Sequence, residues 1–280
     1  MALPQFLVIG HIVKDITVGG WRPGGGVAYA ARQALELGLR VAAVTRCGPD
    51  LDPEALVPGV DWRVSRSNVT TTFENHYGPR GREQRLPALA PPIRLADVPE
   101  EWREAPIILF APVFHDVDPA LPQQIGGAAA LVGIGAQGWL RRCEAGRVLP
   151  GEIEAGPAWL HGDVVFVSEE DAVNPEEAEV WQQSVPCVVL TRAGRGCTVW
   201  DASGGHEITA LPSTEVDPTG AGDVFAAAFL VAMSEGGDAV EAARFGAAAA
   251  ALAVEGAGLE AVAGRRAIER LNEHRAVAPS

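Results

Sequence analysis

Two glycines and two aspartates in one short segment have the spacing to perform phosphate chemistry. The segment reads Asp217-Pro218-Thr219-Gly220-Ala221-Gly222-Asp223 and leads into an alanine-rich stretch. Glycines free the backbone to point successive N–H groups at one spot, and the start of a helix adds partial positive charge there. Gly220, Ala221 and Gly222 are therefore predicted to form an anion hole that needs no lysine. Asp223 would be repelled by phosphate and instead fits a general base that takes a proton from a hydroxyl group.

The composition agrees with a phosphate site that lacks an ammonium group. The chain has 280 residues, with 36 acidic against 22 basic side chains and a net charge of −14. Lys14 is its single lysine, which excludes a Walker P-loop and the strand lysine of a protein kinase. The strong negative charge argues against nucleic acid and anionic membrane surfaces as partners.

The cysteines and the N-terminus indicate in which cellular compartment we expect the protein. Cys47, Cys143, Cys187 and Cys197 form no CxxC pair, so we expect small buried hydrophobic side chains in a reducing environment. The N-terminus lacks the basic and apolar regions of a signal peptide, and no apolar run reaches the roughly 18 residues of a membrane span. These features predict a cytoplasmic protein with no membrane partner.

Short apolar runs alternate with helical patterns along most of the chain. Continuous apolar runs predict buried parallel strands at residues 6–9, 41–44, 107–110, 129–134, 164–167 and 187–191. Helical patterns cover residues 27–37, 176–184, 222–234 and 239–254. This alternation predicts a layered α/β fold, in a single domain over residues 1–280.

One stretch departs from this rhythm and predicts a small β lid. Over residues 61–87, threonines, aromatic and polar residues alternate around a turn at Gly78-Pro79-Arg80-Gly81, which indicates an antiparallel hairpin. Residues 11–18 alternate in the same way. A lid built from about 11–22 and 61–90 would cover a substrate and exclude water. Such a lid can pair with its twin across a homodimer or act alone, and the sequence leaves both open.

By itself, the Gly-Ala-Gly-Asp segment could also be an ordinary turn followed by a first-turn acid. The wider pattern, Asp-x-x-Gly-Ala-Gly-Asp, resembles the C-terminal signature of the PfkB/ribokinase family of sugar kinases. Further segments resemble that family in the same order, at residues 10–15, 24–31, 48–50, 136–141, 191–196 and 245–258. The resemblance implies a ribokinase-like three-layer αβα sandwich with a mainly parallel central sheet and a small β-flap lid.

The resemblance also implies an activity and residue roles. It implies an ATP- and Mg²⁺-dependent kinase that transfers the γ-phosphoryl group to a hydroxyl of a sugar, a cyclitol such as myo-inositol, or a related polyol. The acceptor would be bound by Asp15, Gly24, Gly25, Tyr29 and Asp217. The nucleotide would be bound by Thr191, Arg192, Gly194, Gly196, Ala257 and Gly258. Glu170 and Asp171 stand in the segment that holds Mg²⁺ in the family, and they are the candidate metal residues.

Three positions depart from the family pattern. Tyr29 stands where the family usually has asparagine, Ser168 replaces the amide of the metal segment, and Ala193 replaces the first glycine of the nucleotide turn. Members similar to plant myo-inositol kinase share the aromatic residue and the serine-type replacement, which makes a cyclitol a candidate acceptor. The sequence does not determine which acceptor or which hydroxyl is used.

Two sequence features favour functions other than that of a kinase. The changes at Ser168 and Ala193 would suit a non-catalytic sugar- or nucleotide-binding protein on the same fold. Residues 133–138 match GxGxxG, the pattern of a nicotinamide-linked oxidoreductase. That pattern normally belongs to the first βαβ unit, whereas here it lies mid-chain and Gly146 follows before a full helix can form.

Two polar groups have both functional and structural interpretations. The run His115-Asp116-Val117-Asp118 could bind a metal, but loop residues that cap the next element are the favoured interpretation. Arg192 and Arg195 suit either donor phosphates or a solvated surface.

Overall fold

Nine strands form the main sheet of the computed structural model, which describes residues 3–17, 19–78 and 81–277. The strand order is β15-β14-β13-β12-β9-β8-β1-β4-β5. Their bounds are β1 (Phe6–Ile9), β4 (Val41–Cys47), β5 (Asp61–Arg66), β8 (Ile107–Phe110), β9 (Leu131–Gly135), β12 (Val164–Ser168), β13 (Cys187–Thr191), β14 (Cys197–Asp201) and β15 (Gly204–Ile208). Neighbouring strands are parallel from β5 through to β13, and β14 and β15 add an antiparallel edge.

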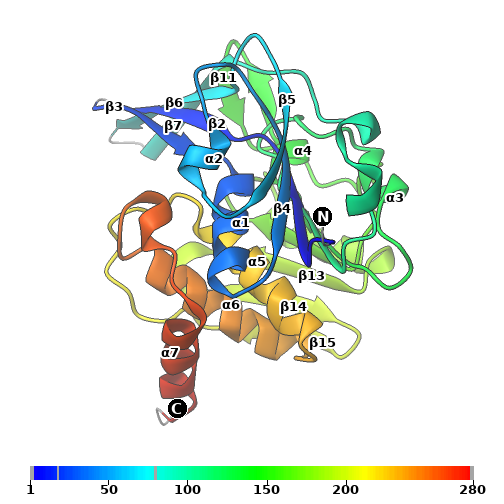
Figure 1. Ribbon diagram of the computed structural model, residues 1–280. Helices are drawn as coiled ribbons and strands as arrows, with labels where there is room; N and C mark the ends of the chain where they lie inside the picture. The colour runs from blue at the N-terminus through cyan, green and yellow to red at the C-terminus, as the bar shows by residue number, and fades with distance from the viewer. Residues whose placement is uncertain (1–2, 18, 79–80, 278–280) are drawn as a thin grey trace.

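Helices cover both faces of this sheet. The α-helices are α1 (Gly26–Glu36), α2 (Pro53–Leu56), α3 (Leu121–Gln124), α4 (Gln137–Leu140), α5 (Ala221–Ser234), α6 (Ala239–Ala253) and α7 (Arg265–Val277). Short 3₁₀ helices are η1 (Leu95–Asp97), η2 (Glu100–Trp102), η3 (Pro175–Gln183), η4 (Ala193–Arg195) and η5 (Gly258–Ala261). Figure 1 shows α1, α5 and α6 lying together on one side of the sheet.

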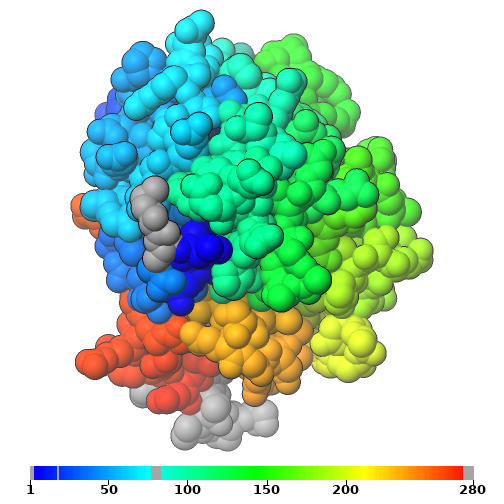
Figure 2. Space-filling view, turned by 45° about the vertical axis from the view of Figure 1, so that its right-hand side comes forward, coloured from blue at the N-terminus to red at the C-terminus, as the bar shows by residue number. Residues whose placement is uncertain are grey.

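Alternating side chains of β1, an interior strand of the sheet, pack into two separate layers of the core. Phe6 and Val8 of β1 pack in the cluster that contains α1, α5 and α6, whereas Leu7 and Ile9 pack with Trp139 on the other face. This alternation follows from the period of two in a strand. In Figure 2, segments from the N-terminal third (blue to cyan), the middle (green) and the C-terminal part (orange to red) of the chain adjoin on one face of the molecule. The predicted three-layer α/β sandwich is confirmed, and its loops after the parallel strands meet at one edge.

A second sheet of six strands forms the lid. Its order is β10-β11-β7-β6-β2-β3. The strand bounds are β2 (Val13–Thr17), β3 (Gly20–Gly24), β6 (Thr72–Gly78), β7 (Gly81–Ala88), β10 (Arg142–Glu144) and β11 (Arg147–Leu149). It lies above α1 in the view of Figure 1. The predicted β6–β7 hairpin is confirmed, and Pro79 and Arg80 of its predicted turn lie outside the described residues.

The structure corrects the predicted limits of the lid. Residues 61–66 form β5, which pairs in parallel with β4 in the main sheet and therefore belongs to the body. The β10–β11 hairpin joins the lid through Arg147 and Arg85 and was not predicted. Its strands have only three residues each, which is too short for an alternation of polar and apolar residues to signal a strand.

Two further expectations need correction. The predicted helix at 176–184 is the 3₁₀ helix η3, whose buried residues Ala178 and Trp181 are three apart, matching three residues per turn. Cys143 is exposed, while the other three cysteines are buried as expected. Within the described part of the chain, no helix is long and apolar enough to cross a membrane.

Candidate active site

The acceptor side of the site is formed where the lid meets the body. A side chain at Gly24 would overlap the carboxylate of Asp15, so these two predicted residues lie in contact across the β2–β3 pair. Asn75 Nδ2 donates to Asp15 Oδ1 at 3.3 Å, and Gln84 Nε2 donates to Asn75 Oδ1 at 3.0 Å. Asn75 and Gln84 are buried polar residues of the lid that the sequence prediction missed. Their signal was the alternation of β6, which puts Asn75 on the same face as the buried Phe73.

Asp223 lies directly against the start of α1. It sits in the first turn of α5, and a side chain at Gly26 would overlap its carboxylate. Burial, together with the negative charge of Asp171, raises the pKa of Asp223 to about 7, although Arg141 opposes this shift. A carboxylate with a pKa near the working pH is suited to act as a general base.

The turn before α5 carries Asp217 and the glycines of the predicted anion hole. Gly220 adopts the left-handed conformation with φ of 78°, which glycine accepts without strain. The amides of Ala221 and Asp223 donate to Pro218 O at 3.2 Å and to Gly220 O at 3.1 Å. Gly222 is exposed, and a side chain added there would meet no other atom within 4 Å. The approach to the helix N-terminus is therefore open at Gly222.

Tyr29 joins this turn to the acceptor side. Its ring occupies the space where a side chain at Gly220 would stand. Burial and the nearby charges of Asp217 and Asp15 raise the pKa of the Tyr29 hydroxyl, which therefore stays neutral. Arg22 of β3 reaches Asp217 from the lid, with 3.4 Å between Nη1 and Oδ2. Acceptor residues predicted from three separate segments are thus brought together, and Gly25 begins α1 beside them.

The candidate metal residues face different surroundings. Asp171 is almost fully buried, with Arg141 Nε at 3.3 Å from Oδ1 and Gln137 Nε2 at 3.5 Å from Oδ2. Glu170 is exposed, and its amide donates to Ser168 Oγ. Among the described residues, no group of three or more His, Cys, Asp or Glu side chains could hold a metal ion. A Mg²⁺ ion that keeps its waters and binds donor phosphates needs one or two carboxylates. Glu170 fits that need, whereas the Asp171 carboxylate is already engaged by Arg141.

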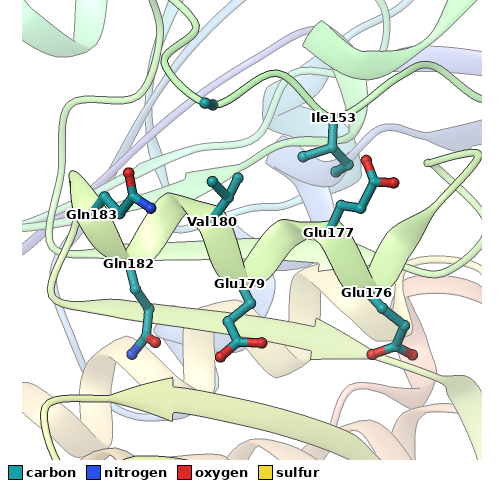
Figure 3. Close-up of a pocket in the computed structure, with 8 residues that line it drawn as sticks. Ile153, Glu176, Glu177, Glu179, Val180, Gln182 and Gln183 are labelled. Carbon is teal, nitrogen blue, oxygen red and sulfur yellow. The ribbon is translucent and has the colours of Figure 1, made fainter.

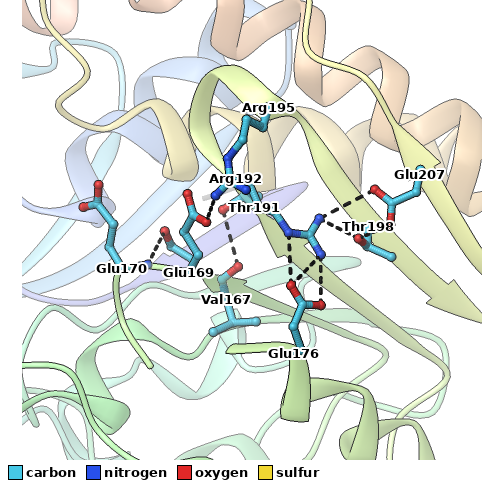
Figure 4. A network of polar contacts seen from close by, with 10 residues as sticks. Val167, Glu169, Glu170, Glu176, Thr191, Arg192, Arg195, Thr198 and Glu207 are labelled. Carbon is cyan, nitrogen blue, oxygen red and sulfur yellow. Dashed lines mark hydrogen bonds and ion pairs between the residues drawn. The ribbon is translucent and has the colours of Figure 1, made fainter. Parts of the chain in front are cut away.

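The predicted nucleotide segment lies between β13 and β14 (Figure 4). Arg192 donates to both oxygens of Glu176 at 3.1 Å and to Thr198 Oγ1 at 2.6 Å, and Arg195 pairs with Glu169. Both arginine charges are thus balanced by glutamates. Thr191 Oγ1 donates to Val167 O of the neighbouring strand at 3.4 Å.

The structure requires glycine at one position of this segment and leaves another unconstrained. Gly196 has a φ of 94°, and a side chain there would overlap Ile208 O, so this position requires glycine. Gly194 faces open space. Ala257 and Gly258 stand at the start of η5, beyond α6, which packs against β14 and β15.

Two alternative motifs have structural explanations. In the GxGxxG stretch, side chains at Gly133 and Gly138 would overlap Leu230 and Pro112, and the helix that follows has only four residues. These glycines therefore serve close packing. Asp116 accepts the backbone N–H groups of His11 at 2.7 Å, Val113 at 2.7 Å and Phe114 at 2.8 Å. This agrees with the favoured interpretation of a loop cap.

A cavity of about 660 Å³ lies outside this site (Figure 3). It is lined by residues of η3 and of the loop before β12, with Ile153 next to Glu177. None of the predicted site residues lines it. Its walls carry three glutamates, so the cavity is unsuited to a phosphate donor.

Comparison with known proteins shows similarity to kinases. Residues 161–263 match the sequence profile described as pfkB family carbohydrate kinase. The cytidine kinase of Thermococcus kodakarensis is 26% identical over 86% of this chain and 93% of its own. The inositol 3-kinase of Oryza sativa subsp. japonica is 27% identical over 86% of this chain and 66% of its own. Over residues 161–263 the chain is therefore similar to the PfkB family of carbohydrate kinases.

Solved structures of ribokinase-family kinases share the fold of this chain. A pyrophosphate-dependent kinase in the ribokinase family, complexed with a pyrophosphate analog and myo-inositol, has a TM-score of 0.76 at 22% identity, covering 95% of this chain and 99% of that chain. The ribokinase of Arabidopsis thaliana, complexed with ribose and ATP, has a TM-score of 0.70 at 21% identity, covering 97% and 99%. The predicted ribokinase-like fold is confirmed.

The profile match and the kinase relatives together indicate that this chain is a phosphotransferase with an alcohol group as acceptor. The profile match covers Ser168–Asp171, the nucleotide segment and the turn before α5. The alternatives of a nicotinamide-linked oxidoreductase and of a non-catalytic binding protein find no support in these comparisons.

Proposed function

We propose that this protein transfers the γ-phosphoryl group of ATP to a hydroxyl of a cyclitol such as myo-inositol, or of a related sugar or polyol. The position of Asp223 carries this proposal. Its carboxylate lies against Gly26 at the start of α1, between the acceptor residues of the lid and the open turn at Gly222. A base at that point reaches both an acceptor hydroxyl and a phosphate at the helix N-terminus.

The proposed mechanism is a direct in-line transfer. Asp15, Asp217 and the backbone of Gly24 and Gly25 hold the acceptor, and Asp223 takes the proton of the reacting hydroxyl. The acceptor oxygen forms a bond to the γ-phosphorus as the bond to the bridging oxygen breaks, so the electron pair leaves with ADP. Asp223 later releases the proton to water.

Backbone amides would stabilise the charge on the transferring group. We assign this role to the N–H groups of Gly220 and Gly222, at the positive end of α5, because those of Ala221 and Asp223 donate within the turn itself. The open space at Gly222 supports this assignment. Because the turn contains no lysine, the backbone and the helix dipole supply positive charge there.

The donor would lie along the segment after β13. Thr191, Arg192, Gly194 and Gly196 would border the phosphates, with Ala257 and Gly258 beside the base. Mg²⁺, when bound, would neutralise the donor phosphates, and Glu170 is the carboxylate that fits it. Because solved neighbours include a pyrophosphate-dependent kinase, pyrophosphate is the second donor to test.

Tyr29 supports a cyclitol as the acceptor. It is a bulky neutral phenol next to three carboxylates, Asp15, Asp217 and Asp223. Its ring narrows the site beside Gly220, and its hydroxyl supplies both a donor and an acceptor to a ring of hydroxyl groups. The inositol 3-kinases among the relatives agree with this choice.

We also propose that the lid pairs with the lid of a second copy. Ile16 and Trp21 are exposed apolar side chains, cross-strand partners on the lid pair β2–β3. Sedimentation velocity of the wild type and of Trp21→Ser tests this: a dimer in the wild type alone is expected, and a monomeric wild type would contradict it.

A screen of donors and acceptors tests the function. ATP or pyrophosphate, each with Mg²⁺, is incubated with pentoses, hexoses, inositols, nucleosides and sugar phosphates, and ADP or orthophosphate release is measured. We expect ADP release with ATP and fastest turnover with an inositol. Binding of ATP and polyol without any release, in wild type and Asp223→Asn alike, would contradict the proposal.

A further inference from the structure

Arg141 is a largely buried cation in the middle of the proposed site. It directly follows α4, the short helix after β9, and its side chain is 14% exposed. Its Nε contacts Asp171 Oδ1 at 3.3 Å, and its Nη1 donates to Val113 O at 3.3 Å. A guanidinium has five N–H donors, so these two bonds leave donors for a ligand.

The strand order puts Arg141 between the two halves of the site. Strand β9 lies between β8, which precedes Val113, and β12, which leads into Asp171. Acceptor residues lie beyond β8, around β1 and the lid, while the nucleotide segment lies beyond β12, after β13. A phosphoryl group that moves from donor to acceptor must cross this midline.

Arg141 also lies within electrostatic range of the proposed base. Its positive charge and the negative charge of Asp171 act on Asp223 in opposite directions. By contrast, Arg192 and Arg195 lie at the donor end and are paired with Glu176 and Glu169. Lys14 is paired with Asp50 at 2.5 Å. Arg141 is therefore the cation whose charge acts on Asp223.

A contribution to folding stability alone would not explain the buried ion pair between Arg141 and Asp171. Burying two charges costs desolvation energy that their attraction barely repays, and apolar side chains of similar volume often serve as well. Held by Asp171 and Val113 O, however, the guanidinium is fixed in one orientation. A fixed, partly exposed guanidinium is suited to two oxygens of a phosphate.

We propose that Arg141 binds the phosphoryl group during transfer and that Asp171 is the residue that positions its guanidinium. This inference rests on the proposed kinase function. It assigns Asp171 a role through Arg141 instead of through a metal ion, and it gives the transferring phosphoryl group a cationic side chain as a partner. The bonds made and broken are those of the transfer described above.

Variants of Arg141 test this with a neighbouring arginine as control. Arg142 is exposed and bonds to Pro150 O and Glu144, away from the site. We expect Arg141→Ala to lower kcat about 10²–10³-fold, the range for loss of one transition-state donor. The acceptor KM should stay within about threefold, and Arg141→Lys should retain intermediate activity. Arg142→Ala should leave kcat and both KM values unchanged.

A double variant separates phosphoryl binding from simple charge balance. If Arg141 only neutralised Asp171, then Arg141→Gln combined with Asp171→Asn would restore kcat. We expect the double variant to fold, with a melting temperature near that of the wild type, and to stay at least 10²-fold slow. Recovery of kcat in this variant, or near-normal kcat in Arg141→Ala, would overturn the inference alone. An inactive wild type would instead overturn the kinase proposal.

Discussion

The ring of Tyr29 fills the space that a side chain at Gly220 would need. This contact joins α1, which carries acceptor residues, to the turn before α5, which faces the phosphate. Because Gly220 also has a φ of 78°, both packing and backbone conformation require glycine there. Gly222, two residues later, has neither constraint. The two glycines of one motif therefore have different roles, and variants can separate them.

Substitution at the two glycines should give different defects. Gly220→Ala should lower the melting temperature and the activity together, since the new methyl group displaces Tyr29 and strains the backbone. Gly222→Val should keep the melting temperature within about 2 °C, because its side chain meets open space. It should still lower kcat/KM for ATP by filling the approach to the helix N-terminus. Thermal melts and initial rates check this, and equal melting losses in both variants would contradict it.

Replacement of Asp223 should stop the chemical step. Asp223→Asn removes the proton acceptor while keeping the shape of the side chain, so kcat should fall about 10²–10⁴-fold. ATP should still bind and raise the melting temperature of the variant. Near-normal turnover in Asp223→Asn would remove this residue from the role of base.

The pH dependence of kcat/KM should report the same carboxylate. The pKa of Asp223 is raised to about 7 by burial and by Asp171. Only the ionised form accepts a proton, so kcat/KM should fall about tenfold per unit as the pH drops below 7. A profile that is flat from pH 5.5 to 8 would show that no such group limits the reaction.

Ionisation of Asp223 should lower the stability of the folded protein, although it raises the activity. A raised pKa means that the folded state favours the protonated carboxyl group, so stability is lost as the pH rises toward the folded pKa of about 7. Asp223→Asn cannot ionise and escapes this loss. The variant should therefore melt at a higher temperature than the wild type at pH 8. The difference in melting temperature between the variant and the wild type should shrink as the pH falls toward 4. Calorimetry of both proteins at pH 4 and pH 8 measures this difference.

The lid should set acceptor affinity through Asn75. Asn75→Ala removes the amide that orients Asp15, while Glu74 on the other face of β6 gives a matched control. Loss of one buried hydrogen bond to a charged group costs about 1.5 kcal/mol, which is roughly tenfold. The acceptor KM should rise by that factor in Asn75→Ala and stay unchanged in Glu74→Ala. An equal change in both variants would contradict the assignment.

Most of the body could be predicted from the sequence because its strands are buried on both faces. The runs at Phe6–Ile9, Ile107–Phe110 and Cys187–Thr191 are continuous apolar segments and form strands with those bounds. The glycine-rich turn before α5 was equally readable, since its residues follow one another in the chain. Such local signals need no knowledge of tertiary contacts.

Residues that act through distant contacts could not be predicted in the same way. Asn75 reaches Asp15, and Gln84 reaches Asn75, only once the lid strands pair. Arg141 meets Asp171 only after β9 and β12 become neighbours. The sequence also assigned β5, the edge strand of the main sheet, to the lid, because Asp61–Arg66 mixes polar and apolar residues like a lid strand. Its place is decided by pairing with β4, which the residue pattern does not encode.

Lys14 lies on the lid, between Asp50 of the body and the ring of Trp21, with its Nζ 4.6 Å from the ring centroid. Apart from the amino terminus, a reagent that acylates amines therefore has one target in this protein. A fluorophore attached there would adjoin the indole of Trp21, which quenches it, so its brightness would report the packing of the β2–β3 pair of the lid.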